Sequence, residues 1–214
     1  MERHNLAIII PALNEQLTIK KVVSEVMQYG IPIVVDDGSS DKTGLIARNC
    51  GAHLVTHKKN TGYDGALNSG FSYAIKLNPL YILTIDADFQ HNPSLIKKFI
   101  DQMDNVTDVI VGVRDVSKRF GETLFSMYFM YKFNIKDPLC GLKAYKSSLY
   151  VAQGYFDSFS SVGTELLNFA ALNNSVIKQV DIETTPRQDV SRFGGKFTAN
   201  LKLIKALVRL ILKN

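Results

Sequence analysis

Short apolar runs alternate with amphipathic stretches over roughly the first half of the chain. The apolar runs lack polar alternation and several are rich in β-branched residues, which is typical of strands buried on both faces of a parallel sheet. We expect strands at Leu6–Ile10, Ile31–Val35, His53–Thr56, Tyr81–Ile85 and Val109–Val113. Helical patterns lie between them, at Thr18–Tyr29, Asp41–Cys50, Asp64–Leu77 and Pro93–Met103. This alternation predicts an α/β fold, a Rossmann-like and mostly parallel sheet sandwiched by helices.

The second half of the chain is less regular. It predicts a helix around Phe120–Phe133, a turn at Asp137-Pro138, a helix near Thr164–Leu172, a strand near Val176–Ile182 and a final helix from Phe197. No linker, repeat or low-complexity run interrupts the chain, so we expect a single domain. Residues 1–196 would form its body, and residues 197–214 would form a basic C-terminal helix that either belongs to the same domain or contacts a membrane.

The bulk composition is that of an ordinary soluble domain, with 46% hydrophobic and 21% charged residues among 214. The first residues do not have the pattern of a signal peptide, and no apolar run reaches the roughly 18 residues of a membrane span. We therefore expect a cytoplasmic protein whose two cysteines, Cys50 and Cys140, are reduced and buried. Their isolation from other cysteines and histidines excludes a zinc site.

Positive charge is concentrated at the end of the chain. From Arg187 onward there are seven basic residues and one acidic residue, so this segment carries a formal charge of +6, and residues 1–186 carry −1 of the total of +5. Read as a helix, its apolar residues Phe197, Leu201, Ile204, Val208 and Ile211 share one stripe, with Leu203, Leu207 and Leu210 beside it, opposite Thr198, Lys202, Lys205, Arg209 and Lys213. Such a helix can lie on the inner face of a membrane or pack against the core. Nucleic-acid binding is disfavoured because no aromatic platform is interleaved with the charges.

Two aspartates follow the buried run that ends near Ile85, in the stretch YILTIDADFQH. Asp86 and Asp88 can point into one opening once the chain leaves the pleat, and like charges held together are costly unless a cation relieves them. Mg²⁺ and Mn²⁺ prefer carboxylate oxygens, and Mg²⁺ is commonly held by one or two carboxylates plus substrate phosphates. The pattern therefore predicts a diphosphate-binding metal site, to which Gln90 could add a neutral oxygen.

Other strand ends also carry chemistry. Asp36 ends the second apolar run, where its carboxylate could accept hydrogen bonds from a base edge or a ribose. The first turn, PALNE, lacks both the dinucleotide fingerprint G-x-G-x-x-G and the P-loop pattern, which disfavours those nucleotide-binding classes. The four histidines, His4, His53, His57 and His91, are expected at the surface.

Six motifs stand in the order found in family 2 glycosyltransferases of the GT-A fold, namely IIIPALNE, VVDDGSSDKT, KNTGYDGALNSGF, DADFQH, VGVR and DPLCGLKAY. The chain most resembles dolichyl-phosphate mannosyltransferase-like enzymes along almost its whole length. The resemblance implies that a nucleotide-diphosphate sugar and a divalent metal, Mg²⁺ or Mn²⁺, bind at the strand ends. It assigns residues to the nucleotide (Pro11, Leu13, Glu15, Asp36), to the metal (Asp86, Asp88, Gln90), to an acceptor phosphate (Arg114, Arg119, Thr123) and to a late loop over the site (Arg187, Ser191, Arg192, Phe193).

The expected reaction is transfer of a sugar, with inversion, from a UDP- or GDP-sugar to a membrane-associated acceptor. A polyprenyl phosphate acceptor would need no general base because its oxygen is already anionic, whereas a sugar hydroxyl would need one. Glu165 is the candidate base, and capping of a helix is its alternative role. Lys143 is a further candidate for the acceptor phosphate. Two other functions are kept open, a sugar-1-phosphate nucleotidyltransferase and a nucleotide-binding membrane adaptor without catalysis.

Overall fold

The computed structural model describes residues 5–115, 119–184 and 196–213, and side chains at 196 and 197 are left out of the description. Within these ranges a seven-stranded sheet has the order β3-β2-β1-β4-β6-β5-β7. Strands β1 to β4 run parallel, β6 is antiparallel to both β4 and β5, and β7 is parallel to β5. The α/β fold with a mostly parallel sheet is thus confirmed.

The strands are β1 (Leu6–Ala12), β2 (Ile31–Asp36), β3 (His53–Thr56), β4 (Tyr81–Thr84), β5 (Val109–Arg114), β6 (Lys143–Lys146) and β7 (Ile177–Ile182). The α-helices are α1 (Ile19–Val26), α2 (Thr43–Asn49), α3 (Gly62–Ala74), α4 (Ile96–Ile100), α5 (Phe120–Phe133), α6 (Ser147–Gln153), α7 (Glu165–Leu172) and α8 (Lys196–Lys213). Short 3₁₀ turns at Ile75–Leu77 and Pro93–Leu95 extend α3 and precede α4.

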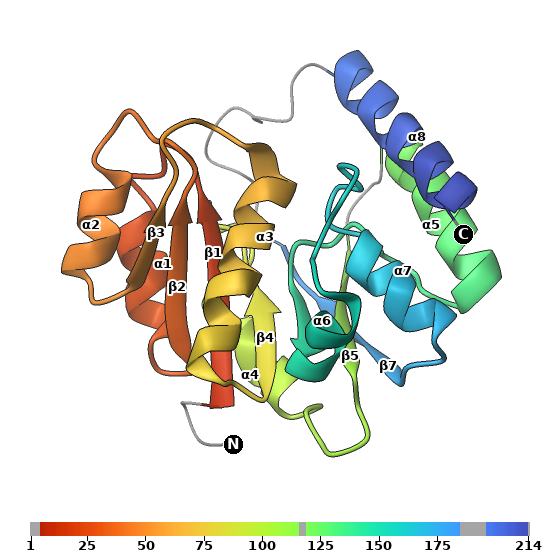
Figure 1. Ribbon diagram of the computed structural model, residues 1–214, viewed down its shortest axis with the longest axis horizontal. Coiled ribbons are helices and arrows are strands. Elements are labelled where there is room, and N and C mark those ends of the chain that lie inside the picture. Colours follow the sequence, from red (N-terminus) through yellow and green to blue (C-terminus); the bar gives the residue numbers. More distant parts are fainter. Residues whose placement is uncertain (1–4, 116–118, 185–195, 214) are drawn as a thin grey trace.

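Each face of the sheet is covered by helices, as Figure 1 shows. Along β1, Leu6, Ile8 and Ile10 pack into the core under α1, α2 and α4, while Ala7 and Ile9 pack into the opposite core with α3, α5, α7 and α8. Because successive strand side chains point to opposite faces, a strand buried on both sides must be apolar at every position. This burial explains the lack of polar alternation in the sequence.

The elements that the sequence did not predict are β6 and α6. Strand β6 has four residues, of which the first and last are Lys143 and Lys146, so it does not read as a buried strand. It is inserted between β4 and β5, where Ala144 and Tyr145 are fully buried. Tertiary position, not local propensity, makes this segment a strand.

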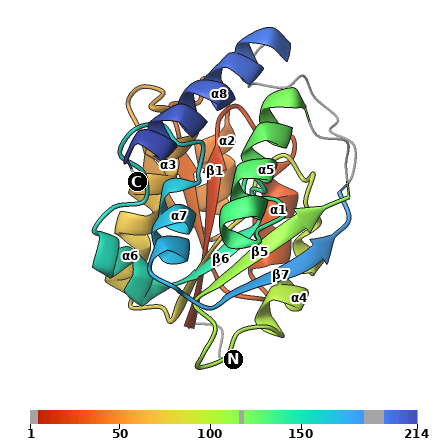
Figure 2. The same cartoon turned by 90° about the vertical axis from the view of Figure 1, so that its right-hand side faces the viewer.

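Helix α8 packs against α5 at one end of the molecule (Figures 1 and 2). Its Leu203, Leu207 and Leu210 are buried with Phe125 and Phe129 of α5 in one core cluster. The structure therefore shows that the C-terminal helix packs against the core through Leu203, Leu207 and Leu210. No helix among the described residues has the length and apolar character needed to cross a bilayer.

Candidate active site

The carboxyl ends of β2, β1 and β4 lie next to one another because these strands are neighbours in the parallel part of the sheet. Ligands of open α/β sheets bind outside this edge. The chain leaves the sheet there in three loops, which begin after Ala12, Asp36 and Thr84. Most of the predicted nucleotide and metal residues are carried by these loops.

The first two loops are bonded to each other. The Asn14 N–H donates to the Ser39 hydroxyl (2.9 Å), and the Asn14 side chain accepts the Ser40 N–H (2.8 Å). The Glu15 N–H donates to the hydroxyl of Thr43 (2.7 Å). Asn14 has a φ of 54°, in the left-handed region that asparagine tolerates better than most residues. The residues predicted to hold the nucleotide therefore stand on one cross-linked unit.

Adjacent aspartates at the end of β2 have separate surroundings. Asp36 is buried, and its Oδ1 accepts the Ser39 N–H at 2.9 Å. Its Oδ2 lies against Gly44, where a Cβ would be only 2.4 Å away, so Gly44 leaves room for the carboxylate. Of the other predicted nucleotide residues, Glu15 is buried and accepts the Thr18 hydroxyl (3.1 Å), and Pro11 and Leu13 are half-buried.

Asp37 is a structural residue that the sequence did not single out. Its carboxylate accepts the N–H of Thr61 (2.8 Å) and of Gly62 (2.9 Å) and contacts the His57 ring (2.7 Å). The other His57 nitrogen lies 2.8 Å from the Ser69 hydroxyl. Asp37 thus holds the start of α3 against β2, and His57 is partly buried, not at the surface as expected.

Asp86 follows β4 and is partly exposed, with 28% of its side chain accessible. The backbone of Gly141 lies so close that a Cβ there would be 2.3 Å from Asp86 Oδ2. The Thr84 hydroxyl donates to the Gly141 carbonyl (2.7 Å) and fixes this approach. Burial, followed by the negative charge of Asp86, raises the pKa of Tyr63 well above its ordinary value. The Tyr63 phenol, on the first turn of α3, therefore stays protonated beside the carboxylate.

Asp88 and Gln90 lie on the turn that follows. The Gln90 N–H donates to Asp88 Oδ1 at 3.1 Å, and both side chains are partly exposed. Between them Phe89 has a φ of 62°, which is uncommon for a bulky residue and costs of order 1–3 kcal/mol. The three predicted metal residues are thus on one tight turn at the edge of the sheet.

His91 was expected at the surface, and this expectation is wrong. The ring is buried, and neither nitrogen has a hydrogen-bond partner among the described residues. Nδ1 lies 3.6 Å from Asp86 Oδ2. Burial, followed by the positive charge of Arg114, lowers the pKa of His91 to about 4, so the ring is neutral at pH 7. The sequence pattern did not indicate that this ring is buried under the turn.

The predicted acceptor residues do not share one setting. Arg114 ends β5 and makes two bonds to the buried carboxylate of Asp137, from Nε (2.8 Å) and Nη2 (2.9 Å). Arg119 and Thr123 lie at the start of α5, where the Arg119 N–H donates to Glu122 (3.3 Å) and the Thr123 hydroxyl donates to the Arg119 carbonyl (3.1 Å). Thr123 is exposed and Arg119 is partly exposed.

Glu165, the candidate base, is buried at the first position of α7. Its carboxylate accepts the Ser158 N–H (2.6 Å) and the Ser158 hydroxyl (2.9 Å), and it pairs with Lys213 of α8. These bonds tie together a loop, α7 and the C-terminal helix. The side chain is therefore engaged structurally in this conformation.

The loop before α7 has strained backbone dihedral angles, and hydrogen bonds to the side chains of Asp64 and Lys143 hold it in place. Ser160 and Val162 have φ values of 62° and 58°, and this region is unfavourable for a β-branched residue. Asp64 accepts the N–H of Val162 (3.1 Å) and of Gly163 (2.6 Å). Lys143 is buried, not open to an acceptor, and donates to the Gly163 carbonyl at 2.8 Å.

Asp64, which is partly buried, and Lys143, which is buried, have shifted pKa values. Burial, followed by the charge of Asp157, raises the pKa of Asp64 to about 6. Burial lowers the pKa of Lys143 to about 8. Such shifts are found at functional sites and in structural charge networks. Because Asp64 and Lys143 both make hydrogen bonds to the loop, we interpret them as members of a structural charge network.

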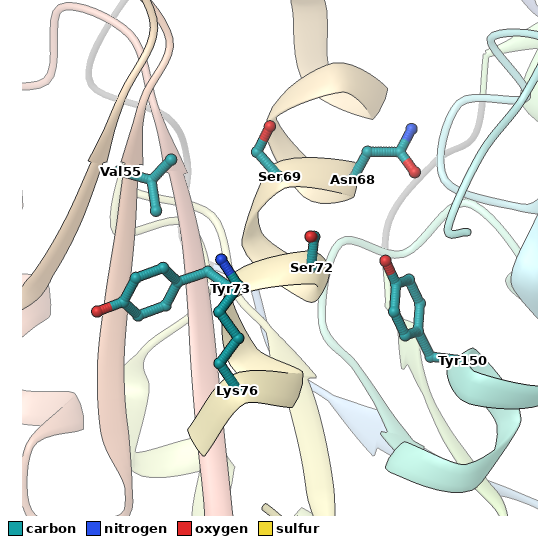
Figure 3. Close-up of a pocket in the computed structure, with 7 residues that line it drawn as sticks. All are labelled: Val55, Asn68, Ser69, Ser72, Tyr73, Lys76 and Tyr150. Carbon is teal, nitrogen blue, oxygen red and sulfur yellow. The ribbon is translucent and has the colours of Figure 1, made fainter. Parts of the chain in front are cut away.

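Other features lie apart from these residues. Arg187, Ser191, Arg192 and Phe193 lie outside the described residues. A hollow of about 420 Å³ on the α3 side of the molecule is lined by Val55, Asn68, Ser69, Ser72, Tyr73, Lys76 and Tyr150 (Figure 3). Its polar groups are largely bonded within the protein, such as Asn68 to the Asp157 carbonyl (2.7 Å). None of the predicted site residues lines it.

Comparison with known proteins places the strand-end motifs in a family. The model for glycosyl transferase family 2 matches residues 7–174. An uncharacterised protein of Methanocaldococcus jannaschii is 26% identical over 97% of this chain and 93% of its own length. A UDP-N-acetylglucosamine–dolichyl-phosphate N-acetylglucosaminyltransferase of Methanococcus voltae is 29% identical over 83% of this chain and 84% of its own length.

Solved structures show the same fold. Glucosyl-3-phosphoglycerate synthase from Mycobacterium tuberculosis, in complex with Mn²⁺, UDP and phosphoglyceric acid, superposes with a TM-score of 0.74. The superposition covers 96% of this chain and 78% of that one at 19% sequence identity, so it establishes the GT-A-like fold alone. Since the family model spans the three loops at the sheet edge and most of the chain, the protein belongs to glycosyl transferase family 2.

Proposed function

We propose that the protein transfers a sugar, with inversion, from a nucleotide-diphosphate sugar to a polyprenyl phosphate or a related lipid-linked acceptor. The observation that carries the proposal is the convergence of Asp36, Asp86 and Asp88 at one edge of the parallel sheet in a family 2 chain. The Methanococcus voltae relative is named for a UDP-sugar donor and a dolichyl-phosphate acceptor, and the structural neighbour was crystallised with UDP. A uridine donor is therefore favoured over a guanosine donor.

In this proposal Asp36, Glu15, Pro11 and Leu13 contact the nucleoside. The cross-linked loops that carry them hold their backbone rigid before the donor binds. Asp36 is the best placed of the four to select the base or ribose, since it is a buried carboxylate at the end of β2. Arg187 and Arg192 would meet the diphosphate from the late loop, since arginine suits a bidentate contact with phosphate.

The residues on the turn after β4 fit a divalent metal. The missing side chain at Gly141 leaves room for the Asp86 carboxylate, and Asp88 and Gln90 add oxygen donors two and four residues later. Among the described residues no group of three His, Cys, Asp or Glu side chains could hold a metal unaided. Such an incomplete set suits Mg²⁺ or Mn²⁺, which takes further oxygens from a bound diphosphate. When bound, the metal would neutralise the charge that develops on the departing diphosphate.

The reaction needs few acid–base groups if the acceptor is a phosphate. The acceptor oxygen attacks C1 of the sugar, the bond from C1 to the diphosphate oxygen breaks, and the nucleoside diphosphate leaves with the electron pair. No proton has to be removed from an anionic acceptor. A phosphate acceptor is therefore compatible with the bonds that Glu165 makes to Ser158 and Lys213. Glu165 would act as a general base only if the acceptor were a sugar hydroxyl.

Binding of nucleoside diphosphate with metal tests the proposed donor. At roughly 100 times Kd a ligand that binds only the folded state stabilises it by ~2.7 kcal/mol. For a chain of this size that is a rise of about 5–10 °C in the melting temperature. We expect UDP with Mn²⁺ to produce this rise in thermal unfolding, and UDP or Mn²⁺ alone to produce much less. No rise with UDP or GDP and either metal would contradict the proposal.

The acceptor role of Arg119 gives a kinetic prediction. A hydrogen bond to a charged group contributes about 1.5–3 kcal/mol, so Arg119→Ala should raise the KM for the acceptor by about 10–100-fold. The KM for the donor should stay within about twofold, because the nucleotide residues are on other loops. Arg48→Ala, at an exposed arginine of α2, is the matched control and should leave both constants unchanged. A weaker donor with an unchanged acceptor would assign Arg119 to the donor instead.

A further inference from the structure

Helix α5 carries a row of large apolar side chains that face solvent. Phe120, Met127 and Tyr131 are 66%, 62% and 94% exposed, and spacings of seven and four residues put them on one side of the helix. Met130 is also exposed and lies next to this row. Large exposed apolar side chains that occur singly need no explanation, but a row along one helix does.

Helix α8 carries a second exposed row. Leu201, Val208, Ile211 and Leu212 are each more than two-fifths exposed, while Leu203, Ala206, Leu207 and Leu210 are buried. The stripe that the sequence pattern picked out is thus largely the exposed one, and the residues beside it form the core contact. Lys202 and Lys205 lie along one edge of this exposed row and are also exposed.

The two rows adjoin. Helices α5 and α8 pack together, and the Gly121 N–H donates to the Asn200 side chain at 3.0 Å. These bonded residues are the chain neighbours of Phe120 on α5 and of Leu201 on α8. A Cβ at Gly121 would meet the side chain of Leu203, so the helices touch closely where the rows meet. We name the eight exposed residues of the two rows the α5–α8 face.

We propose that the α5–α8 face docks onto an anionic lipid bilayer. Lys202 and Lys205 of α8 are exposed beside the apolar row, and the sequence from 196 to 213 contains no acidic residue. A second copy of the chain would bring like charges together, whereas anionic headgroups complement them at roughly 1 kcal/mol per basic residue near the surface. Long aliphatic and aromatic side chains next to lysines are the composition of helices that lie in a membrane interface.

Docking on this face would bring the acceptor-binding residues to the membrane surface, an inference that rests on the proposed function. Arg119 and Thr123, the proposed acceptor-phosphate residues, flank Phe120 on the first turn of α5. A protein seated on this face would hold them at the level of the headgroups. There a polyprenyl phosphate presents its phosphate while its chain stays in the bilayer. The acceptor would then reach the sheet edge without leaving the membrane.

Two basic residues of α8 are not part of the membrane contact. Arg209 donates to the Phe159 carbonyl at 3.1 Å, and Lys213 binds Ser158 at 2.7 Å and pairs with Glu165. They hold the strained loop before α7. Charge reversal at these positions would therefore disturb the fold. Lys202 and Lys205, whose side chains are exposed, are the basic residues of α8 that can meet lipid headgroups.

The test is sedimentation with vesicles of phosphatidylcholine that contain about one third phosphatidylglycerol, at low salt. The wild type should bind. Met127→Ser/Leu212→Ser should bind at least tenfold more weakly at an unchanged melting temperature. Lys202→Glu/Lys205→Glu should lose at least tenfold on these vesicles and bind pure phosphatidylcholine like the wild type. Leu45→Ser/Val106→Ser removes two exposed apolar side chains elsewhere and is the matched control.

The outcomes separate this surface from the chemistry. Asp88→Asn should bind vesicles like the wild type, and Met127→Ser/Leu212→Ser should transfer sugar normally to a water-soluble short-chain isoprenyl phosphate. Vesicle binding without any transfer would refute the proposed function and leave the docking surface standing. A wild type that stays in the supernatant at low salt would overturn the docking proposal. So would a face variant that binds like the wild type, or a wild-type dimer that the face variant dissociates without any vesicle binding.

Discussion

Asp88→Asn is expected to lower the rate of sugar transfer by about 10³-fold, the scale of losing one preorganised group that stabilises a charged transition state. The substitution removes a negative charge beside the proposed metal and diphosphate but keeps the shape of the side chain. Its amide oxygen can still accept the Gln90 N–H that Asp88 Oδ1 accepts at 3.1 Å. The turn should therefore persist, and circular dichroism and the melting temperature without ligand should match the wild type.

A chelator should have the same effect on the wild type, and Mn²⁺ or Mg²⁺ in excess should restore it. Asp101→Asn is the matched control, because Asp101 is an exposed carboxylate that pairs with Lys97 on the adjacent turn of α4. It should retain full activity. Wild-type activity of Asp88→Asn in the presence of chelator would remove the metal assignment, and loss of the fold in this variant would leave Asp86→Asn to decide the matter.

The first half of the fold could be predicted because its strands are buried on both faces. Short continuous apolar runs such as Leu6–Ile10 are typical of fully buried strands, and each is followed by a turn and an amphipathic helix. Strand β6 gave no such signal. Its two lysines are accommodated by the carbonyls of Gly163 and Asn105, which come from distant parts of the chain.

The candidate site was predictable where charge interrupts an apolar run. Asp36, Asp86 and Asp88 stand at such interruptions, and the structure brings them to one edge of the sheet. His91 and Asp37 were not found, because burial of a single polar side chain depends on what packs over it. Asp64 had no signal other than its place in a motif. Its partners, Val162 and Gly163, are about a hundred residues away.

The C-terminal helix shows the limit of a helical wheel. The pattern separated apolar from basic positions correctly, but it could not say which part of the apolar arc meets the domain. Packing against Phe125 and Phe129 selects Leu203, Leu207 and Leu210. The remaining arc is left to solvent. A single apolar arc therefore provides a core contact on one side and an exposed row on the other.

The pair formed by Arg114 and Asp137 gives the second large effect, on stability. Asp137→Ala should lower the free energy of unfolding by about 3–5 kcal/mol, because removal of one partner leaves a buried charge uncompensated. The Asp137 side chain is 1% exposed and that of Arg114 is 18% exposed, so water can reach neither freely. The lost carboxylate also accepts the Arg114 N–H at 3.1 Å. For a chain of this size the melting temperature should fall by roughly 6–20 °C.

A double substitution separates the loss of an interaction from the stranding of a charge. Arg114→Met/Asp137→Leu replaces both partners with apolar side chains, and such replacements of buried ion pairs are often neutral or stabilising. It should therefore unfold several degrees above Asp137→Ala, and denaturant titration of both variants measures the difference. Because the double variant remains folded, it also tests Arg114 as an acceptor residue, since its KM for the acceptor should then rise while donor binding holds. If Asp137→Ala costs no more than Asp101→Ala at the exposed carboxylate, the pair does not stabilise β5, and Arg114 is instead free to turn toward a ligand.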